Sequence, residues 1–152
     1  MRNLFTGLFL FCSISVFGQI IEVEKPKFEK IGEVKPGGIA FICSMQISKG
    51  STKDDTNTYL WTYNNARYKS IDNINTISFN ANENDFNSFY EMLKSQITSP
   101  KGTEKQIVLG KSNVLIETIR NLGVSSLTIH DLSQDGYFYL TSSQIDKLFG
   151  KK

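Results

Sequence analysis

The chain has 152 residues, of which 17 are Lys or Arg and 15 are Asp or Glu, so its formal net charge at pH 7 is only +2. This balance argues against proteins that bind nucleic acids or anionic membranes, because both classes concentrate positive charge on one surface. The length suits a single domain whose core is large enough to fold without disulfide bonds.

Residues 1–18 are predicted to be a cleavable secretory signal peptide. Arg2 supplies a positive start, residues 4–16 are uncharged and rich in Leu, Phe, Ile and Val, and the small residue Gly18 ends the segment. The alternative, a buried N-terminal strand, leaves the charged start and the cleavage pattern unexplained. Because the apolar run is shorter than the ~20 residues that a spanning helix needs, we expect no transmembrane segment after cleavage.

The rest of the chain is expected to be a charged, extended lead-in over 19–37, followed by a single domain over 38–150. Cleavage of the signal peptide would leave Cys43 as the one cysteine, so no intrachain disulfide is expected. This composition fits an exported protein of the periplasm or the medium better than a disulfide-rich secreted domain.

Alternating apolar residues predict strands in the first half of the chain. We expect them at 39–47, 59–63, 67–71 and 76–80. The polar, glycine-containing segment 48–57 is expected to be a loop. Asn64 and Asn65 can both adopt the left-handed conformation of a tight hairpin, which would return the chain at residue 67.

The period then changes to that of a helix. Apolar and aromatic residues recur on one face at 86, 89, 90, 93 and 97, which predicts a helix over 83–97. Asn82 can cap its N-terminus, and Pro100 lies beyond its end.

A second run of strands, again followed by a capped helix, is predicted in the remainder of the chain. The strands are expected at 105–109, 114–119, 124–130 and 137–140, and the helix at 142–149. A helix over 114–122 is the alternative for the second of these strands, but its β-branched residues favour a strand. Thr141 and Gln144 form a capping box for the final helix.

The predicted fold class is therefore α+β, with an antiparallel β-sheet of about seven to nine strands and two helices packed on one face. The order of strands followed by a capped helix occurs twice, which indicates a repeat of structure, although the residues of the two halves are barely similar.

A nucleophilic thiol at Cys43 would need His130 as its base, although the two residues lie far apart in the sequence. The alternation of residues places Cys43 among core side chains, where a thiol is inert, and places His130 on the opposite side of its strand from Leu127 and Ile129. An envelope hydrolase that uses Cys43 and His130 is thus an alternative function, and no catalytic residue is predicted.

Asp131, Ser133, Asp135 and Gly136 have the spacing of the first half of a calcium-binding loop. Ser142 stands where the closing glutamate would be required, and an ordinary Asp-Gly hairpin explains the same residues. A calcium-stabilised structural module is a further alternative, and no metal or other cofactor is predicted.

Aromatic residues give the one indication of binding. Tyr59, Trp61 and Tyr63 share one face of a strand, and Arg67 and Tyr68 follow just beyond it. An exposed row of this kind would suit a protein interface or the stacking of a sugar. The other interpretation places these rings in the core beneath the first helix. The sequence favours an exported, non-catalytic domain that binds a protein or a glycan.

Overall fold

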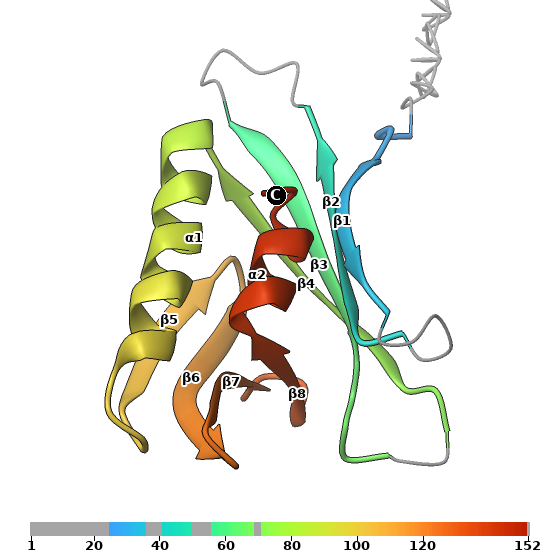
Figure 1. Ribbon diagram of the computed structural model, residues 1–152. Coiled ribbons are helices and arrows are strands. Elements are labelled where there is room, and N and C mark those ends of the chain that lie inside the picture. The colour runs from blue at the N-terminus through green and yellow to red at the C-terminus, as the bar shows by residue number, and fades with distance from the viewer. Residues whose placement is uncertain (1–24, 36–40, 50–55, 69–70, 152) are drawn as a thin grey trace, which may run out of the picture.

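The structure, a computed structural model, describes residues 25–35, 41–49, 56–68 and 71–151 (Figure 1). The predicted signal peptide over 1–18 lies outside these residues. Within them the chain forms four strands and a helix, and then again four strands and a helix. The α+β class with antiparallel strands and two helices is confirmed, and the strands divide into two sheets of four.

Each sheet is an antiparallel meander, in which every strand pairs with the next one in the chain. The first sheet consists of β1 (Glu29–Val34), β2 (Cys43–Ser48), β3 (Asn57–Asn64) and β4 (Ile74–Ala81). The second consists of β5 (Glu104–Leu109), β6 (Ser112–Asn121), β7 (Val124–Asp131) and β8 (Gly136–Thr141). Alternate residues of β3, β4, β6 and β8 are buried, as the sequence pattern predicts.

Both helices begin directly after the last strand of a sheet. The first, α1, spans Glu83–Thr98, and the Asn82 side chain accepts a hydrogen bond from the Asp85 amide at 2.8 Å. The second, α2, spans Ser142–Leu148 and begins with the predicted capping box between Thr141 and Gln144. Each cap satisfies backbone amides that would otherwise lack a partner at the start of a helix. Neither helix of the described residues is long and apolar enough to cross a membrane.

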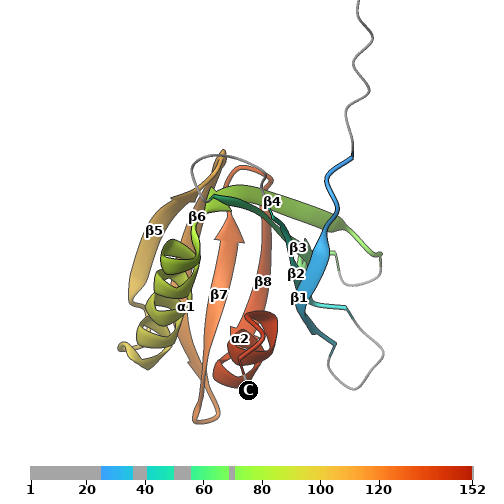
Figure 2. The same ribbon diagram turned by 90° about the horizontal axis from the view of Figure 1, so that it is seen from above.

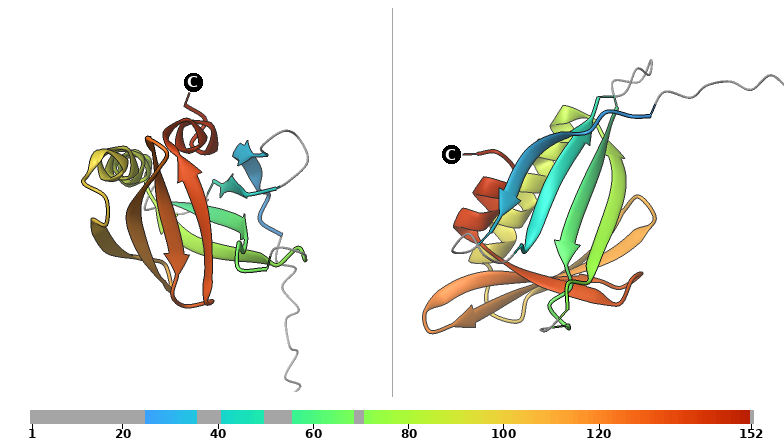
Figure 3. Two further views of the ribbon diagram at one scale, coloured as in Figure 1. Left: turned by 60° about the horizontal axis from the view of Figure 1, so that its bottom comes forward. Right: turned by 90° about the vertical axis from the view of Figure 1, so that its right-hand side faces the viewer.

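Each helix follows one sheet in the chain and makes most of its strand contacts with the other sheet. The helix α1 follows the first sheet but packs on β6 and β7 of the second, whereas α2 follows the second sheet and packs on β1 of the first (Figure 2). In the right-hand view of Figure 3, the strands of the first sheet descend onto the second sheet, whose strands lie across their lower ends. At Gly32 of β1 a Cβ atom would lie only 2.0 Å from the Lys147 carbonyl oxygen of α2, so this crossing requires glycine.

One apolar core fills the space between the two sheets and the two helices. It contains residues from both sheets and from both helices. Its largest fully buried side chains are Trp61, Tyr59, Tyr63, Phe138 and Met45. The outer face of the second sheet lies opposite this core and carries the exposed Tyr139.

Two parts of the chain differ from the sequence prediction. Residues 29–34, expected within the lead-in, form β1, which pairs with β2 and buries Val34. Its charged side chains conceal the pattern, because Lys30 and Lys35 form exposed ion pairs with Glu33.

The described residues of the predicted return strand over 67–71, which are 67, 68 and 71, are not in a strand, so this prediction is wrong for them, and the next strand begins at Ile74. Residues 69–70 lie outside the described part of the chain. Asn65 does not enter a tight hairpin, because its side-chain oxygen accepts hydrogen bonds from the amides of Arg67 and Tyr137. These bonds hold a wider loop against the second sheet.

A polar cluster fastens the two helices to each other. Lys94 of α1 donates a hydrogen bond to the Asp146 carboxylate of α2 at 2.8 Å, and the Tyr90 hydroxyl donates to the same oxygen at 2.8 Å. The hydrogen bond from Lys94, followed by that from Tyr90, lowers the pKa of Asp146 below its usual value of 3.8. The charged form of Asp146 is therefore the one that stabilises the contact between the helices.

This pKa shift predicts an acid-dependent contribution to stability. Because the pKa of Asp146 is lower in the folded state, its contribution is present above the unfolded pKa and is lost as the pH falls through the folded pKa. Since the pair is partly exposed, we expect Asp146→Asn to cost at most about 1 kcal/mol at pH 7. Urea denaturation should show that this cost shrinks as the pH falls below the unfolded Asp pKa of about 3.9. Glu91→Gln, at an exposed position of α1, is the control and should leave the stability at pH 7 unchanged.

Candidate functional site

The aromatic row of β3 lies in the core. Tyr59, Trp61 and Tyr63 are 2%, 0% and 0% exposed. Trp61 meets Phe89 of α1 and Phe138 of β8 edge to face, with ring centroids 5.6 and 5.2 Å apart. These three rings join the two sheets and α1, so in this fold they offer no surface to a partner. Their burial supports the second of the two interpretations made from the sequence.

The loop that begins with Asp131 has the geometry of a hairpin. The Asp131 carboxylate is buried and accepts hydrogen bonds from the Ser133 and Gln134 amides, the Gln134 side chain and the Tyr63 hydroxyl. Asp135 instead turns outward, with 77% of its side chain exposed. The candidate calcium ligands Asp131, Ser133 and Asp135 thus make separate contacts, since Ser133 accepts a hydrogen bond from the Asn113 amide and Asp135 pairs with Arg67. No group of three or more possible metal-ligating His, Cys, Asp or Glu side chains occurs among the described residues.

Cys43 and His130 are not brought together. Cys43 is fully buried on the inner face of the first sheet, and this burial raises the pKa of its thiol to about 12. His130 lies on β7 in the second sheet, where its Nε2 atom is 3.9 Å from a Glu117 carboxylate oxygen on the outer face. The two side chains therefore do not form the thiolate–imidazole pair that the hydrolase alternative requires.

Arg67 and Tyr68, the other two candidate residues, do remain at the surface. Arg67 donates to the Asp135 carboxylate and so links the loop after β3 to the β7–β8 turn. Tyr68 is 45% exposed and lines a hollow of about 300 Å³ at the junction of the two sheets. Tyr139 of β8 lines the same hollow from the other side.

The outer face of the second sheet carries a larger hollow of about 490 Å³. We call it the outer hollow. It is lined by Lys101, which precedes β5, and by eight residues of β6, β7 and β8, namely Glu117, Ile119, Asn121, Ser126, Thr128, His130, Tyr137 and Tyr139. The strand register explains why these strand residues lie together, since residues that pair directly across two adjacent antiparallel strands point to the same face of the sheet. One row across the sheet consists of Glu117, Thr128 and Tyr139, and the next ends in His130 and Tyr137.

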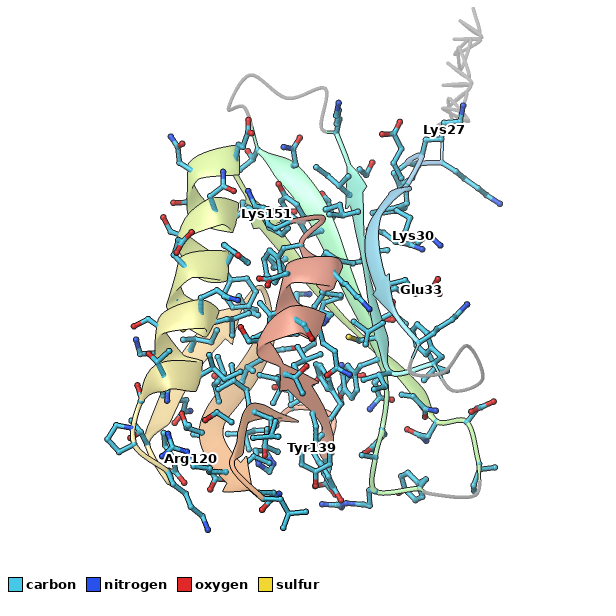
Figure 4. The ribbon with its side chains drawn as sticks, in the orientation of Figure 1. Lys27, Lys30, Glu33, Arg120, Tyr139 and Lys151 are labelled. Carbon is cyan, nitrogen blue, oxygen red and sulfur yellow. The ribbon has the colours of Figure 1, made fainter. Side chains whose placement is uncertain are left out.

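The rings of the outer hollow form a short, open series. His130 and Tyr137 have centroids 5.7 Å apart, and Tyr137 meets Tyr139 edge to face at 5.5 Å. Tyr139 is 45% exposed, and Figure 4 shows it below the two helices, at the lower side of the molecule. Burial, followed by a hydrogen bond with Tyr137 and the charge of Glu117, raises the pKa of Tyr139. Its hydroxyl is therefore protonated at neutral pH and can donate a hydrogen bond.

Polar groups surround these rings. Thr128 is only 4% exposed and forms part of the floor, because Glu117 and Tyr139 flank it on the neighbouring strands. Lys101, which precedes β5, lines the far side. A carboxylate, an ammonium group and several hydroxyls thus lie beside the half-buried ring of Tyr137 and the exposed ring of Tyr139. Such a surface can bind a ligand by stacking and hydrogen bonding.

Sequence reasoning located the strands of this site but did not select its residues. Tyr137 and Tyr139 alternate with Phe138 and Leu140, which are both buried. That alternation was a usable signal, because a strand with two bulky apolar residues on one face must present its tyrosines on the other. His130 carried the same signal and was correctly placed opposite Leu127 and Ile129, which are both fully buried.

Tyr139 of β8 lines both the outer hollow and the smaller hollow beside Tyr68. No protein-family model, no curated protein sequence and no solved structure matches the chain.

Proposed function

We propose that this protein is an exported, non-catalytic domain that binds a protein or glycan partner in the cell envelope or the medium through the outer hollow. The observation that carries this proposal is the outward orientation of Tyr137 and Tyr139 over a polar floor. Tyrosine offers a large, rigid and amphipathic contact surface at a low cost in conformational entropy, which makes it a frequent binding residue.

The scaffold beneath the hollow supports this role. The strands β6, β7 and β8 pair continuously, and their inner faces are fixed by buried residues such as Ile116, Ile129 and Leu140. Side chains that project from such a sheet are positioned by the core rather than by a mobile loop. The proposed export rests on the charged start, the apolar run and the small residues of segment 1–18. Sequencing the N-terminus of protein recovered outside the cytoplasm tests that part of the proposal.

We expect Tyr139→Ala to abolish most of the binding while leaving the fold intact. Its ring is half open, so its removal should cost little stability, whereas a central interface tyrosine contributes about 2 kcal/mol or more to binding. Polysaccharide and protein fractions of the producing cells should be passed over the immobilised wild-type domain and the immobilised variant. Retention by the wild type should fall by about tenfold or more in the variant.

Val108→Ala is the matched control, because Val108 is an exposed side chain of β5 outside the hollow. This variant should retain partner material as the wild type does. Equal retention by the wild type and by Tyr139→Ala would contradict the assignment of the binding surface.

A further inference from the structure

We propose that the ligand of the outer hollow is a neutral glycan, an inference that rests on the binding function proposed above and specifies its partner. Three features of the hollow support it, namely the shape of its aromatic wall, the kind of polar groups beside that wall and the balance of its charges.

The aromatic wall suits a sugar ring. Tyr137 and Tyr139 stand edge to face at 5.5 Å, so the two rings line the hollow with differently oriented surfaces. The C–H groups on one face of a pyranose ring form an apolar patch that packs against such an aromatic surface. The volume of about 490 Å³ falls in the range of ordinary small-ligand sites and leaves the hollow open to a longer chain.

The polar groups match the hydroxyls of a carbohydrate. Each sugar hydroxyl is both a donor and an acceptor, and so it is best bound by a mixture of both kinds of group. Glu117 supplies acceptor oxygens, while Ser126 and Thr128 supply hydroxyls that can serve in either role. The hydroxyl of Tyr139 stays protonated and adds a donor at the edge of the aromatic wall.

The charges of the hollow favour a ligand without net charge. Its lining contains one lysine, Lys101, and one glutamate, Glu117, which balance each other. An anionic polysaccharide would be attracted by Lys101 but repelled by Glu117. A surface that selects an anionic ligand normally carries an excess of positive charge.

The placement of the exposed aliphatic residues argues against a protein partner at this site. Val108, Leu122, Val124 and Leu132 are exposed, but none of them lines the hollow. Apart from the rings, Ile119 is the one aliphatic residue in its lining. The centre of a protein interface is usually depleted of charged residues, whereas this lining contains both Lys101 and Glu117.

The test is binding of the full domain to an array of neutral envelope and storage polysaccharides, with anionic polysaccharides such as pectate and hyaluronate as comparison probes. We expect at least one neutral probe to bind. Its affinity should change little between about 0.1 and 1 M NaCl, because no net charge is neutralised. Tyr139→Ala should weaken this binding by about tenfold, while Val108→Ala, which lies outside the hollow, should leave it unchanged.

The remaining outcomes separate this inference from the function on which it rests. If only the anionic probes bind, or if a protein fraction alone is retained through Tyr139, the neutral glycan is excluded while the binding surface stands. If no polysaccharide and no protein fraction depends on Tyr139, both the ligand and the binding function are excluded. Urea denaturation of each variant confirms that a loss of binding is not a loss of folding.

Discussion

Trp61→Ala is expected to lower the free energy of unfolding by about 3–5 kcal/mol. The indole is fully buried at the point where the first sheet, α1 and the second sheet meet, and it packs edge to face on Phe89 and Phe138. Truncating it removes the contacts of a large ring and leaves a cavity that three elements would have to close together. Since small domains are stable by only about 5–15 kcal/mol, the variant should be marginally folded. Urea or thermal denaturation measures the effect.

Tyr68→Ala is the matched control for Trp61→Ala. Tyr68 also carries a large aromatic ring and lies just beyond the end of β3, but it is half exposed. Its truncation should therefore change stability by no more than about 1 kcal/mol. A Trp61→Ala protein as stable as the wild type would mean that this ring is not part of the core.

A second large loss of stability is expected for Gly110→Ala. Gly110 lies in the turn between β5 and β6 with φ = 59°, and an added Cβ atom would lie 2.1 Å from the Ser78 carbonyl oxygen of β4. The left-handed conformation alone costs a side chain about 1–2 kcal/mol. The forced separation of β4 from the turn adds about 1–3 kcal/mol, because backbone atoms cannot move aside as a flexible side chain can.

Gly123→Ala separates these two contributions. Gly123 lies in the turn between β6 and β7 with φ = 79°, and an added Cβ atom would meet nothing within 4 Å. It should therefore show the conformational cost alone, measured as a shift in the urea midpoint. Equal losses in the two variants would contradict the close approach between the two sheets at Gly110.

Most helices and strands could be predicted because the spacing of their apolar residues shows which face is buried. The stripe that begins at Phe86 and the capping box at Thr141 lie where the sequence places them. The strand β1 was not predicted because it is an edge strand. Its charged side chains reach the solvent, and its one buried residue is Val34. The conformation after Asn64 was not predicted because it depends on a hydrogen bond from the Tyr137 amide to the Asn65 side chain, and Tyr137 is far away in the sequence.

The division of the strands into two sheets could not be derived from alternation, since a strand shows the same period in one sheet or in two. This limit also affected the site. The row of Tyr59, Trp61 and Tyr63 has an unambiguous phase, but only the position of β8 and α1 shows that the row is covered. Tyr137 and Tyr139 have an equally clear phase on the outer face, where Tyr137 is half-buried and Tyr139 is 45% exposed.

The most direct test of this division between core and binding surface is ¹⁹F NMR of protein labelled with 3-fluorotyrosine, in the presence of a soluble gadolinium chelate. The chain has 6 tyrosines, so every resonance can be assigned by single Tyr→Phe substitutions. We expect the chelate to broaden the signals of Tyr68 and Tyr139, which are each 45% exposed, and to leave those of Tyr59 and Tyr63 sharp. Broadening of Tyr59 and Tyr63 with protection of Tyr139 would contradict the account.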